Sequence, residues 1–258
     1  TTIIAVLLAF SLFVLLSGTI TLGNSNAGVT NTTYENNFTH LNVSNSSIVL
    51  YMPFDVNNGS NGITYDYTNN SNDGTMINES VFNSSGVYGG AYTFDGVNDC
   101  MNINNSVNDL STTTKGTWST WVKPVDGTPT ASEAILAFGD AVGTDSLLLL
   151  YSRVTTGRVE MYVRQGTTAK WVLSTDAGAF SDNAWAHIIL VQDGVSPVLY
   201  VNGIAPAQTF TTSTDKTWWF NNDANIDNGR IVCSNFGGSG NADFLNGSID
   251  EAMLWNTA

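Results

Sequence analysis

Basic residues are scarce in this chain. Only 8 Lys and Arg stand against 22 Asp and Glu in 258 residues. The resulting net charge of −14 at pH 7 repels nucleic-acid phosphates and anionic membrane surfaces, so nucleic acid is not an expected partner. The carboxylate excess favours solubility and offers oxygen ligands to hard cations such as calcium.

The sequence also lacks the motifs that indicate catalysis. Glycoside hydrolysis requires two carboxylates on one strand face, as in a Glu-x-Asp-x-x-Glu pattern, and none occurs. Asp250 and Glu251 are adjacent on a predicted strand, so alternation would turn them to opposite faces. His40 lies in a polar stretch, and His187 is typical of a structural strand residue. With no nucleophile, zinc or phosphate-loop motif either, the sequence predicts a protein that is not an enzyme.

Cysteine is nearly absent, with only Cys100 and Cys233 in the chain. Both lie in short strand-like segments, and an extracellular setting would allow them to pair. A disulfide between them would close a loop of about 130 residues, which restricts the unfolded chain and stabilises the fold by several kcal/mol. Two buried free thiols are the alternative; we favour the disulfide.

Charge is missing altogether from the start of the chain, where the first charged residue is Glu35. Within this region Ile3–Leu22 is a nearly continuous apolar run. As a helix, about 20 residues span roughly 30 Å, which is enough to cross the hydrocarbon core of a bilayer. A helix that is apolar on all sides is buried in lipid or among other helices. The sequence therefore predicts a long hydrophobic α-helix at residues 1–22.

Three interpretations of this helix are open. A secretory signal peptide has a start Met and a basic flank and is removed on export. A plain membrane anchor normally keeps a positive cytoplasmic flank. The chain instead begins at Thr1 without a basic flank, and the stretch resembles a processed type IV pilin, in which a basic leader is cleaved directly before the apolar helix. Bacterial pilins usually have Glu at the fifth mature position; Ala5 makes the resemblance one to archaeal pilins and archaellins.

Residues 23–47 form a linker rich in Asn, Ser, Thr and Gly, which cannot bury enough apolar surface to fold alone. Asn-x-Ser/Thr sequons are dense here and shortly after it, and they are substrates for N-glycosylation only in an exported chain. Chance in an Asn-rich composition is the alternative explanation. A tenth sequon, at Asn246, lies apart from the cluster. The predicted glycosylation sites are Asn31, Asn37, Asn42, Asn45, Asn58, Asn69, Asn78, Asn83 and Asn104.

From residue 48 to residue 258 the pattern changes to short runs of β-branched and aromatic residues separated by turn signals. Asp126-Gly127, Asp193-Gly194 and Asn202-Gly203 are typical hairpin turns, and 24 glycines suit many turns. No amphipathic helix of convincing length follows Leu22. The spacing predicts one all-β domain, a sandwich of antiparallel sheets.

Six phrases identify this domain more closely. Their ordered set resembles the laminin-G-like domain of the concanavalin A-like lectin/glucanase superfamily. The resemblance implies a jelly roll of two antiparallel sheets, in which the first and last strands lie side by side. The phrases are LYMPFD (Leu50–Asp55), TYDYTNNSNDGT (Thr64–Thr75), GVYGGAYTFDGVND (Gly86–Asp99), GTWSTWVKP (Gly116–Pro124), AWAHIILVQDGVSPVLYVNG (Ala184–Gly203) and FLNGSIDEAMLWN (Phe244–Asn256).

The final strand and one early loop suggest a structural calcium ion. Strict alternation over Ser248–Trp255 gives two largely apolar faces, so one carboxylate is expected to point inward and to need a partner. The loop Asp66–Gly74 is dense in the oxygen donors that calcium requires. An ordinary Asn-rich turn is the alternative. In the family that the domain resembles, calcium often joins this loop to the final strand, and the matching ligands are Asp66, Asn70, Asn72 and Asp250.

The resemblance to pilins makes this chain an expected structural subunit of an archaeal type IV pilus-like extracellular filament. Its partners would be copies of itself in a helical homopolymer, with the membrane as host before assembly, and the jelly rolls would be displayed outside. Adhesion to surface glycans is a further expectation, and Trp218-Trp219-Phe220 are either sugar-stacking or core residues. The alternative is a membrane-anchored, lectin-like surface binding protein held by the same helix.

Overall fold

The computed structural model describes residues 46–57, 62–143 and 145–258. The predicted N-terminal helix, nearly all of the linker and the sequons at Asn31, Asn37, Asn42, Asn45 and Asn58 lie outside these residues. Within them, no helix is long and apolar enough to cross a bilayer.

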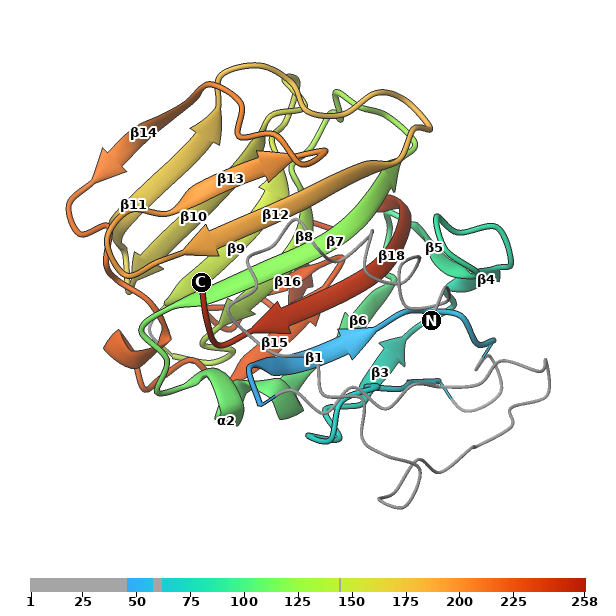
Figure 1. Ribbon diagram of the computed structural model, residues 1–258, viewed down its shortest axis with the longest axis horizontal. Helices are drawn as coiled ribbons and strands as arrows, with labels where there is room; N and C mark the ends of the chain where they lie inside the picture. The colour runs from blue at the N-terminus through green and yellow to red at the C-terminus, as the bar shows by residue number, and fades with distance from the viewer. Residues whose placement is uncertain (1–45, 58–61, 144) are drawn as a thin grey trace, which may run out of the picture.

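The described chain forms a sandwich of two large antiparallel sheets, as predicted (Figure 1). The front sheet in Figure 1 has seven strands, in the order β13-β12-β7-β18-β5-β4, and β1 also pairs with β18. In that order the bounds are Val198–Val201, Ala186–Gln192, Gly116–Pro124, Asn246–Trp255, Ala91–Asp95 and Val81–Asn83, with β1 at Ile48–Met52.

The second sheet has nine strands, in the order β14-β11-β10-β9-β8-β15-β6-β3-β2. A small hairpin, β16 (Ser234–Asn235) and β17 (Asn241–Ala242), follows β15. Three short helical segments complete the described chain: η1 (Asn104–Ser106), α2 (Val107–Leu110) and η2 (Phe220–Asn222). The nine strands span, in order, Gln208–Ser213, Thr168–Thr175, Val159–Gln165, Leu147–Ser152, Glu133–Gly139, Asn228–Ile231, Cys100–Asn102, Gly74–Ile77 and Ile63–Thr64.

The core lies between the two sheets and is dominated by aromatic rings. Trp118 of β7 lies 5.3 Å from Phe138 of β8 and 5.3 Å from Trp219, measured between ring centroids. Trp218, Trp219 and Phe220 are 2%, 0% and 0% exposed. These three residues are therefore core residues, and the interpretation of them as sugar-stacking side chains is wrong. Their polar sequence neighbours do not prevent the loop from turning its rings inward.

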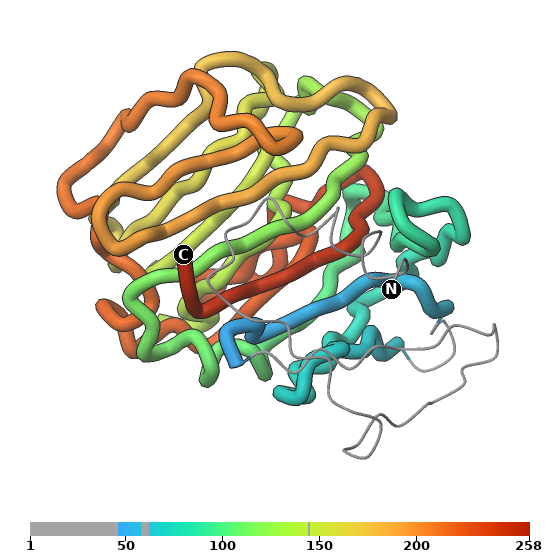
Figure 2. Tube along the Cα trace, viewed as in Figure 1, coloured from blue at the N-terminus to red at the C-terminus, as the bar shows by residue number. Residues whose placement is uncertain are grey.

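The first and last strands lie side by side, as the family resemblance implied. β18 pairs with β1 on one side and with β7 on the other, so that both ends of the described chain lie in the same sheet (Figure 2). The residue that precedes β1 is held next to the end of β18, because the backbone N–H of Asn256 donates to the carbonyl of Ser47.

β18 does not alternate regularly along its length. Its pairing with β7 shifts between Asp250 and Met253, and Glu251 adopts a φ of 52° at this point. Such a bulge inserts an extra residue and resets the alternation. Ile249 before it and Ala252 after it consequently both face the core. The prediction that Asp250 and Glu251 point to opposite faces is therefore wrong, and both lie on the outer side of the sheet.

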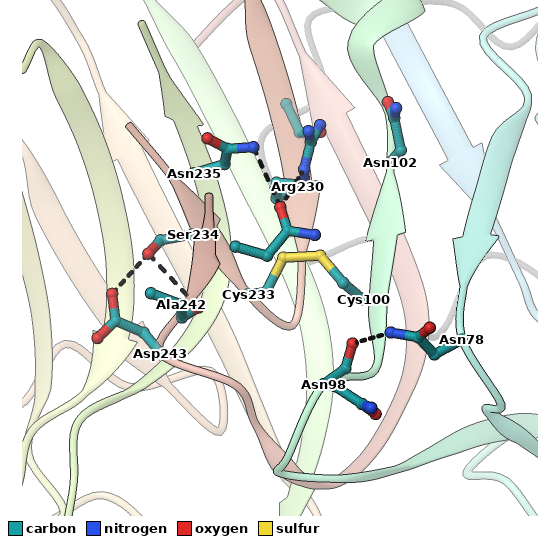
Figure 3. Close-up of a disulfide and its surroundings, with 12 residues drawn as sticks. Asn78, Asn98, Cys100, Asn102, Arg230, Cys233, Ser234, Asn235, Ala242 and Asp243 are labelled. Atoms are coloured by element: carbon teal, nitrogen blue, oxygen red, sulfur yellow. Dashed lines mark hydrogen bonds between the residues drawn. A yellow bond between two sulfur atoms is a disulfide. The ribbon is translucent and has the colours of Figure 1, made fainter. Parts of the chain in front are cut away.

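The predicted disulfide between Cys100 and Cys233 is present (Figure 3). The two Cα atoms are 5.5 Å apart across a sequence separation of 133, and both side chains are fully buried. Cys100 belongs to β6 and Cys233 directly precedes the β16–β17 hairpin. The bond thus joins the hairpin's base to the nine-stranded sheet.

Candidate functional site

The loop predicted to bind calcium is organised by the carboxylate of Asp66. Its Oδ1 accepts from the backbone N–H groups of Tyr51 and Thr68, at 3.0 Å each. Its Oδ2 accepts from the Thr68 hydroxyl at 2.7 Å and from the N–H of Asn72 at 2.9 Å. Asn70 and Asn72 direct their amide nitrogens to the carbonyls of β1. Both oxygens of Asp66 are therefore already in use as hydrogen-bond acceptors.

Asp250, the fourth predicted ligand, is bound by a different loop. Its Oδ2 accepts from the N–H groups of Val87 and Tyr88, at 2.7 and 3.1 Å. Its Oδ1 is buried without a hydrogen-bond partner among the described residues. Burial raises the pKa of Asp250 to about 7. The four residues thus divide between two loops, which does not fit a single shared ion in this arrangement, and calcium remains a prediction.

Glu251 lies beside Asp250 on the outer side of the bulge. Its Oε2 accepts a hydrogen bond from the Tyr51 hydroxyl at 3.0 Å. Burial and, to a smaller extent, the neighbouring charge of Asp250 raise the pKa of Glu251 to about 8. In the described part of the chain, no three acidic, His or Cys side chains meet in a geometry that would hold a metal ion. We call Asp250 and Glu251 the acidic pair.

His187 is a structural strand residue, as predicted. It lies on β12, where its Nε2 is 2.8 Å from the Ser119 hydroxyl. Its ring stacks on Trp121 with centroids 4.8 Å apart. Burial lowers the pKa of His187 to about 4, so the imidazole is neutral at pH 7.

All five sequons in the described chain place their Asn on the surface. An oligosaccharide requires this position, so the geometry permits modification, which remains a prediction. The amide nitrogen of Asn78 donates to the carbonyl of Asn98 at 2.6 Å and would have to leave this bond (Figure 3). The exposed residues are Asn69, Asn78, Asn83, Asn104 and Asn246.

The nine-stranded sheet turns a different set of side chains outward. Tyr162 of β10 lies opposite Leu149 of β9, which lies opposite Ala137 of β8. Ala137 and Leu149 form an apolar cluster outside the main core, against which Tyr162 and Phe236 of the β16–β17 turn pack. By alternation, Glu160 and Arg164 share the face of Tyr162. We call Tyr151, Arg153, Glu160, Tyr162 and Arg164 the arginine face.

At one end of the arginine face, Glu160 is fully partnered. Arg153 Nη1 lies 2.6 Å from its Oε2, and the Tyr151 hydroxyl donates to its Oε1. The Glu160 side chain is 4% exposed, whereas that of Arg153 is 46% exposed. The hydrogen bond to Glu160 raises the pKa of Arg153, and burial raises that of Tyr151. The charge of Glu160 is thus balanced by Arg153, and its two oxygens hold the side chains of Arg153 and Tyr151 in place.

At the other end, the guanidinium of Arg164 lies over two aromatic rings. Its Cζ is 4.7 Å from the ring centroid of Phe236 and 5.9 Å from that of Tyr162. Its Nε is buried and finds no acceptor among residues 46–57, 62–143 and 145–258. A cation at these distances from a ring face is attracted by the ring's negative electrostatic potential, so the two rings stabilise the charge of Arg164.

Arg230 is also on this side of the sheet, but it serves the structure. Its Nη1 donates to Asn104 Oδ1 at 2.6 Å and to the Gly229 carbonyl at 2.8 Å. Its Nε donates to Asn241 Oδ1 at 3.2 Å and so holds the hairpin to the sheet. Burial lowers the pKa of Arg230.

Sequence reasoning found the strands of the arginine face but not the face itself. The sequence predicts short strands throughout residues 48–258, and alternation along the run Val159–Arg164 would have grouped Glu160, Tyr162 and Arg164 on one face. The available signal was the distribution of arginine: of four in the chain, three lie between residues 153 and 164. The role of Phe236 could not be found this way, because the hairpin is distant in sequence.

Comparison with known proteins agrees with this architecture. A laminin G family model, described as the concanavalin A-like lectin/glucanases superfamily, matches residues 94–258. The chain belongs to this superfamily. No curated protein sequence matches the chain.

Solved structures similar to this lectin/glucanase-superfamily domain share its fold at low sequence identity. The CBM40 of the Ruminococcus gnavus IT-sialidase bound to alpha2,3 sialyllactose is 17% identical, with a TM-score of 0.51 over 71% of this chain and 91% of that one. Domain 4 of AbnA, an extracellular GH43 arabinanase from Geobacillus stearothermophilus, in complex with arabinotriose, is 13% identical, with a TM-score of 0.54 over 81% and 92%. The Streptococcus pneumoniae NanB sialidase is 18% identical, with a TM-score of 0.54 over 69% of this chain and 26% of that one. The chain thus spans about a quarter of that sialidase.

Proposed function

We propose that the jelly-roll domain is a carbohydrate-binding module that uses the arginine face. The observation that carries this proposal is the group of aromatic rings on this face: Tyr162 and Phe236 pack on an apolar cluster outside the main core, and the Arg164 guanidinium lies over both rings. Apolar faces of sugar rings stack on aromatic side chains, while fixed polar groups bind the hydroxyls. Similar structures bound to sialyllactose and to arabinotriose support a role in sugar binding.

The proposed module is not catalytic. Hydrolysis of a glycosidic bond needs one carboxyl group as an acid and a second as a nucleophile or base. On the arginine face the carboxylate is Glu160, whose two oxygens are engaged by Tyr151 and Arg153. A carboxylate held in this way orients its donors rather than exchanging protons with a substrate.

The second candidate function concerns how the module is displayed. The uncharged run Ile3–Leu22 favours an extracellular filament of the archaeal type IV pilus kind, with helices of many copies in the core and jelly rolls outside. Each helix would exchange lipid contacts for contacts with its copies, and glycan binding would make the filament adhesive. A membrane-anchored, lectin-like protein is the alternative use of the same helix. Electron microscopy of native surface material separates the two, because filaments support the first and dispersed membrane particles the second.

Glycan binding is tested on the full chain, as filaments or in detergent, first on a glycan array and then by calorimetry. We expect Tyr162→Ala to weaken binding about tenfold or more, because a stacked ring contributes on the order of 1 kcal/mol or more. Tyr200→Ala is the matched control, since Tyr200 lies on β13 of the opposite sheet. Equal losses in both variants, or no glycan bound by the unmodified chain, would contradict the proposal.

A further inference from the structure

We infer that β14 (Gln208–Ser213) is an interaction surface, and that its partner is β14 of a second copy of the chain, paired edge to edge in an antiparallel arrangement. The inference concerns assembly and does not depend on glycan binding. β14 ends the nine-stranded sheet: it pairs with β11 on one side and has no partner strand on the other within the described chain. Figure 1 shows β14 at one flank of the sandwich and β4 at the opposite flank.

The other sheet edges in the described part of the chain are short or already covered. β2 has two residues, and β4 has three, one of which is the sequon residue Asn83. β13 is closed by its own chain, because the Gln208 side chain accepts from the N–H of Leu199 at 2.8 Å and donates to its carbonyl at 3.1 Å. Further along β13, Val201 and Ile204 exchange two backbone hydrogen bonds. These edges therefore offer little backbone to another chain.

β14 is six residues long, and no sequon occurs between Asn104 and Asn246 to shield its flank with an oligosaccharide. A bulge at Thr211 bends the strand but does not pair its outer side. An open edge of this length presents backbone N–H and C=O groups that pair readily with another strand, and natural proteins cover or interrupt such edges. The contrast with the other edges indicates that β14 is covered in the assembled protein.

Charge favours a second copy as the partner. The chain carries −14, so two copies repel each other over most of their surface, but β14 itself has no charged side chain. Asp176 lies at the first end of β14, where it accepts from the Thr209 hydroxyl at 2.7 Å. At the last end, Lys170 and Lys216 outnumber Asp215, whose N–H donates to the Lys170 carbonyl. An antiparallel pair brings the positive end of each copy to the negative end of the other.

Two-fold pairing of β14 is also self-limiting. Each copy contributes the same edge, so the contact uses both open edges and leaves neither for a third chain. With the two-fold axis between Phe210 and Thr211, Thr209 of each copy lies opposite Thr212 of the other, and hydroxyl pairs of this kind stabilise neighbouring strands. A two-fold contact cannot relate successive subunits of a polar filament. It would therefore join copies of neighbouring filaments, or copies side by side in a membrane.

Cysteine cross-linking of the full chain, purified in detergent, tests the inference. Thr211 is exposed and lies next to the two-fold axis, so Thr211→Cys should bring two thiols close enough to form a disulfide between copies. The two native cysteines are joined to each other, which leaves the new thiol as the free one. Val81→Cys is the matched control, because Val81 is 63% exposed on β4 at the opposite flank. Mild oxidation should give a dimer as the main product of Thr211→Cys and only traces from Val81→Cys. Equal yields, or no dimer from Thr211→Cys, would overturn the inference.

Charge variants in the Thr211→Cys background test the antiparallel arrangement. Lys216→Glu should lower the yield of cross-linked dimer severalfold, because it brings like charges together at both ends of the strand pair. Adding Asp176→Lys should restore the yield, since the two charges are then exchanged rather than lost. Lys123→Glu makes the same change of charge at the far end of β7 and should leave the yield unaltered. A loss that Asp176→Lys does not rescue, or an equal loss in Lys123→Glu, would overturn the arrangement. An unchanged melting temperature shows that each variant remains folded.

Discussion

The two outer surfaces of the sandwich both hold charge in partly buried positions, but with opposite signs and different consequences. The nine-stranded sheet carries Arg164 over two rings, and the seven-stranded sheet carries Asp250 and Glu251 at a bulge. Each surface has a buried polar atom that lacks a partner in the described chain, namely Arg164 Nε and Asp250 Oδ1. Arginine keeps its charge, whereas a carboxylic acid can be neutralised by a proton. The same kind of unmet hydrogen bond thus belongs to a permanently charged group on one sheet and to a titrating pair on the other.

The largest expected effect on stability comes from removing the disulfide, which joins β6 of the nine-stranded sheet to the β16–β17 hairpin. The double variant Cys100→Ser, Cys233→Ser should lose about 3–5 kcal/mol of unfolding free energy, because a loop of more than 100 residues is released in the unfolded chain. Chemical denaturation measures this loss.

The same variant should weaken glycan binding, since the hairpin that carries Phe236 is no longer joined to β6. The acidic pair should be unaffected, so that the pH dependence of stability keeps its shape. Unchanged glycan affinity in the folded variant would show that the remaining hydrogen bonds of the hairpin, from Arg230, Gly237 and Gly238, suffice to hold it.

The second effect tests the seven-stranded surface. The pKa of Asp250 is about 7 and that of Glu251 about 8, both above the ordinary values of 3.8 and 4.5. The folded state therefore binds more protons than the unfolded state in this interval, and stability falls as pH rises from about 4.5 to 8. Each unit of pKa shift corresponds to at most about 1.4 kcal/mol, so the loss is on the order of several kcal/mol for the pair. Thermal melts across this pH range measure it.

Asp250→Asn is the control for this titration, because it removes one charge and keeps an oxygen to accept from Val87 and Tyr88. It should flatten the decline in stability above pH 6.

Added calcium gives a second test of the same acidic pair. If the ion binds at Asp250, as the family resemblance implied, it should raise the melting temperature at pH 8 more than at pH 5. No effect of calcium on stability would contradict that prediction.

The contrast between the two surfaces also shows how far sequence reasoning reaches. Turn dipeptides and short apolar runs were enough to predict the sandwich, and the family resemblance of the ordered phrases implied the pairing of β1 with β18. The disulfide was predicted because the chain has only two cysteines and both lie in strand-like segments. The bulge at Glu251 was not predicted, because both faces of Ser248–Trp255 are largely apolar. Shifting the alternation by one residue after Glu251 therefore leaves the apolar pattern almost unchanged. The arginine face was missed because its covering ring, Phe236, belongs to a hairpin some 70 residues after β10. The bulge and the arginine face both depend on residues that are neighbours in the fold but distant in the sequence.

The smallest expected effect is the contribution of His187 to the pH dependence of stability. His187 lies on the same sheet as the acidic pair, and its contribution has the opposite sign. The pKa of His187 is lowered to about 4 by burial, from an ordinary value of 6.5, so the unfolded state binds the extra proton between these values. Stability from this group is complete above pH 6.5 and is lost as pH falls towards 4. Between about pH 4.5 and 6.5 the two carboxyl groups of the acidic pair lose stability as pH rises while this one imidazole gains it, so His187 offsets about half of the decline. NMR titration of the His187 ring should show no protonation until about pH 4, and His187→Gln should steepen the decline in stability between about pH 4.5 and 6.5. A ring that titrates near 6.5 would mean that the Trp121 and Ser119 contacts do not exclude water, and the seven-stranded surface would then be governed by the acidic pair alone.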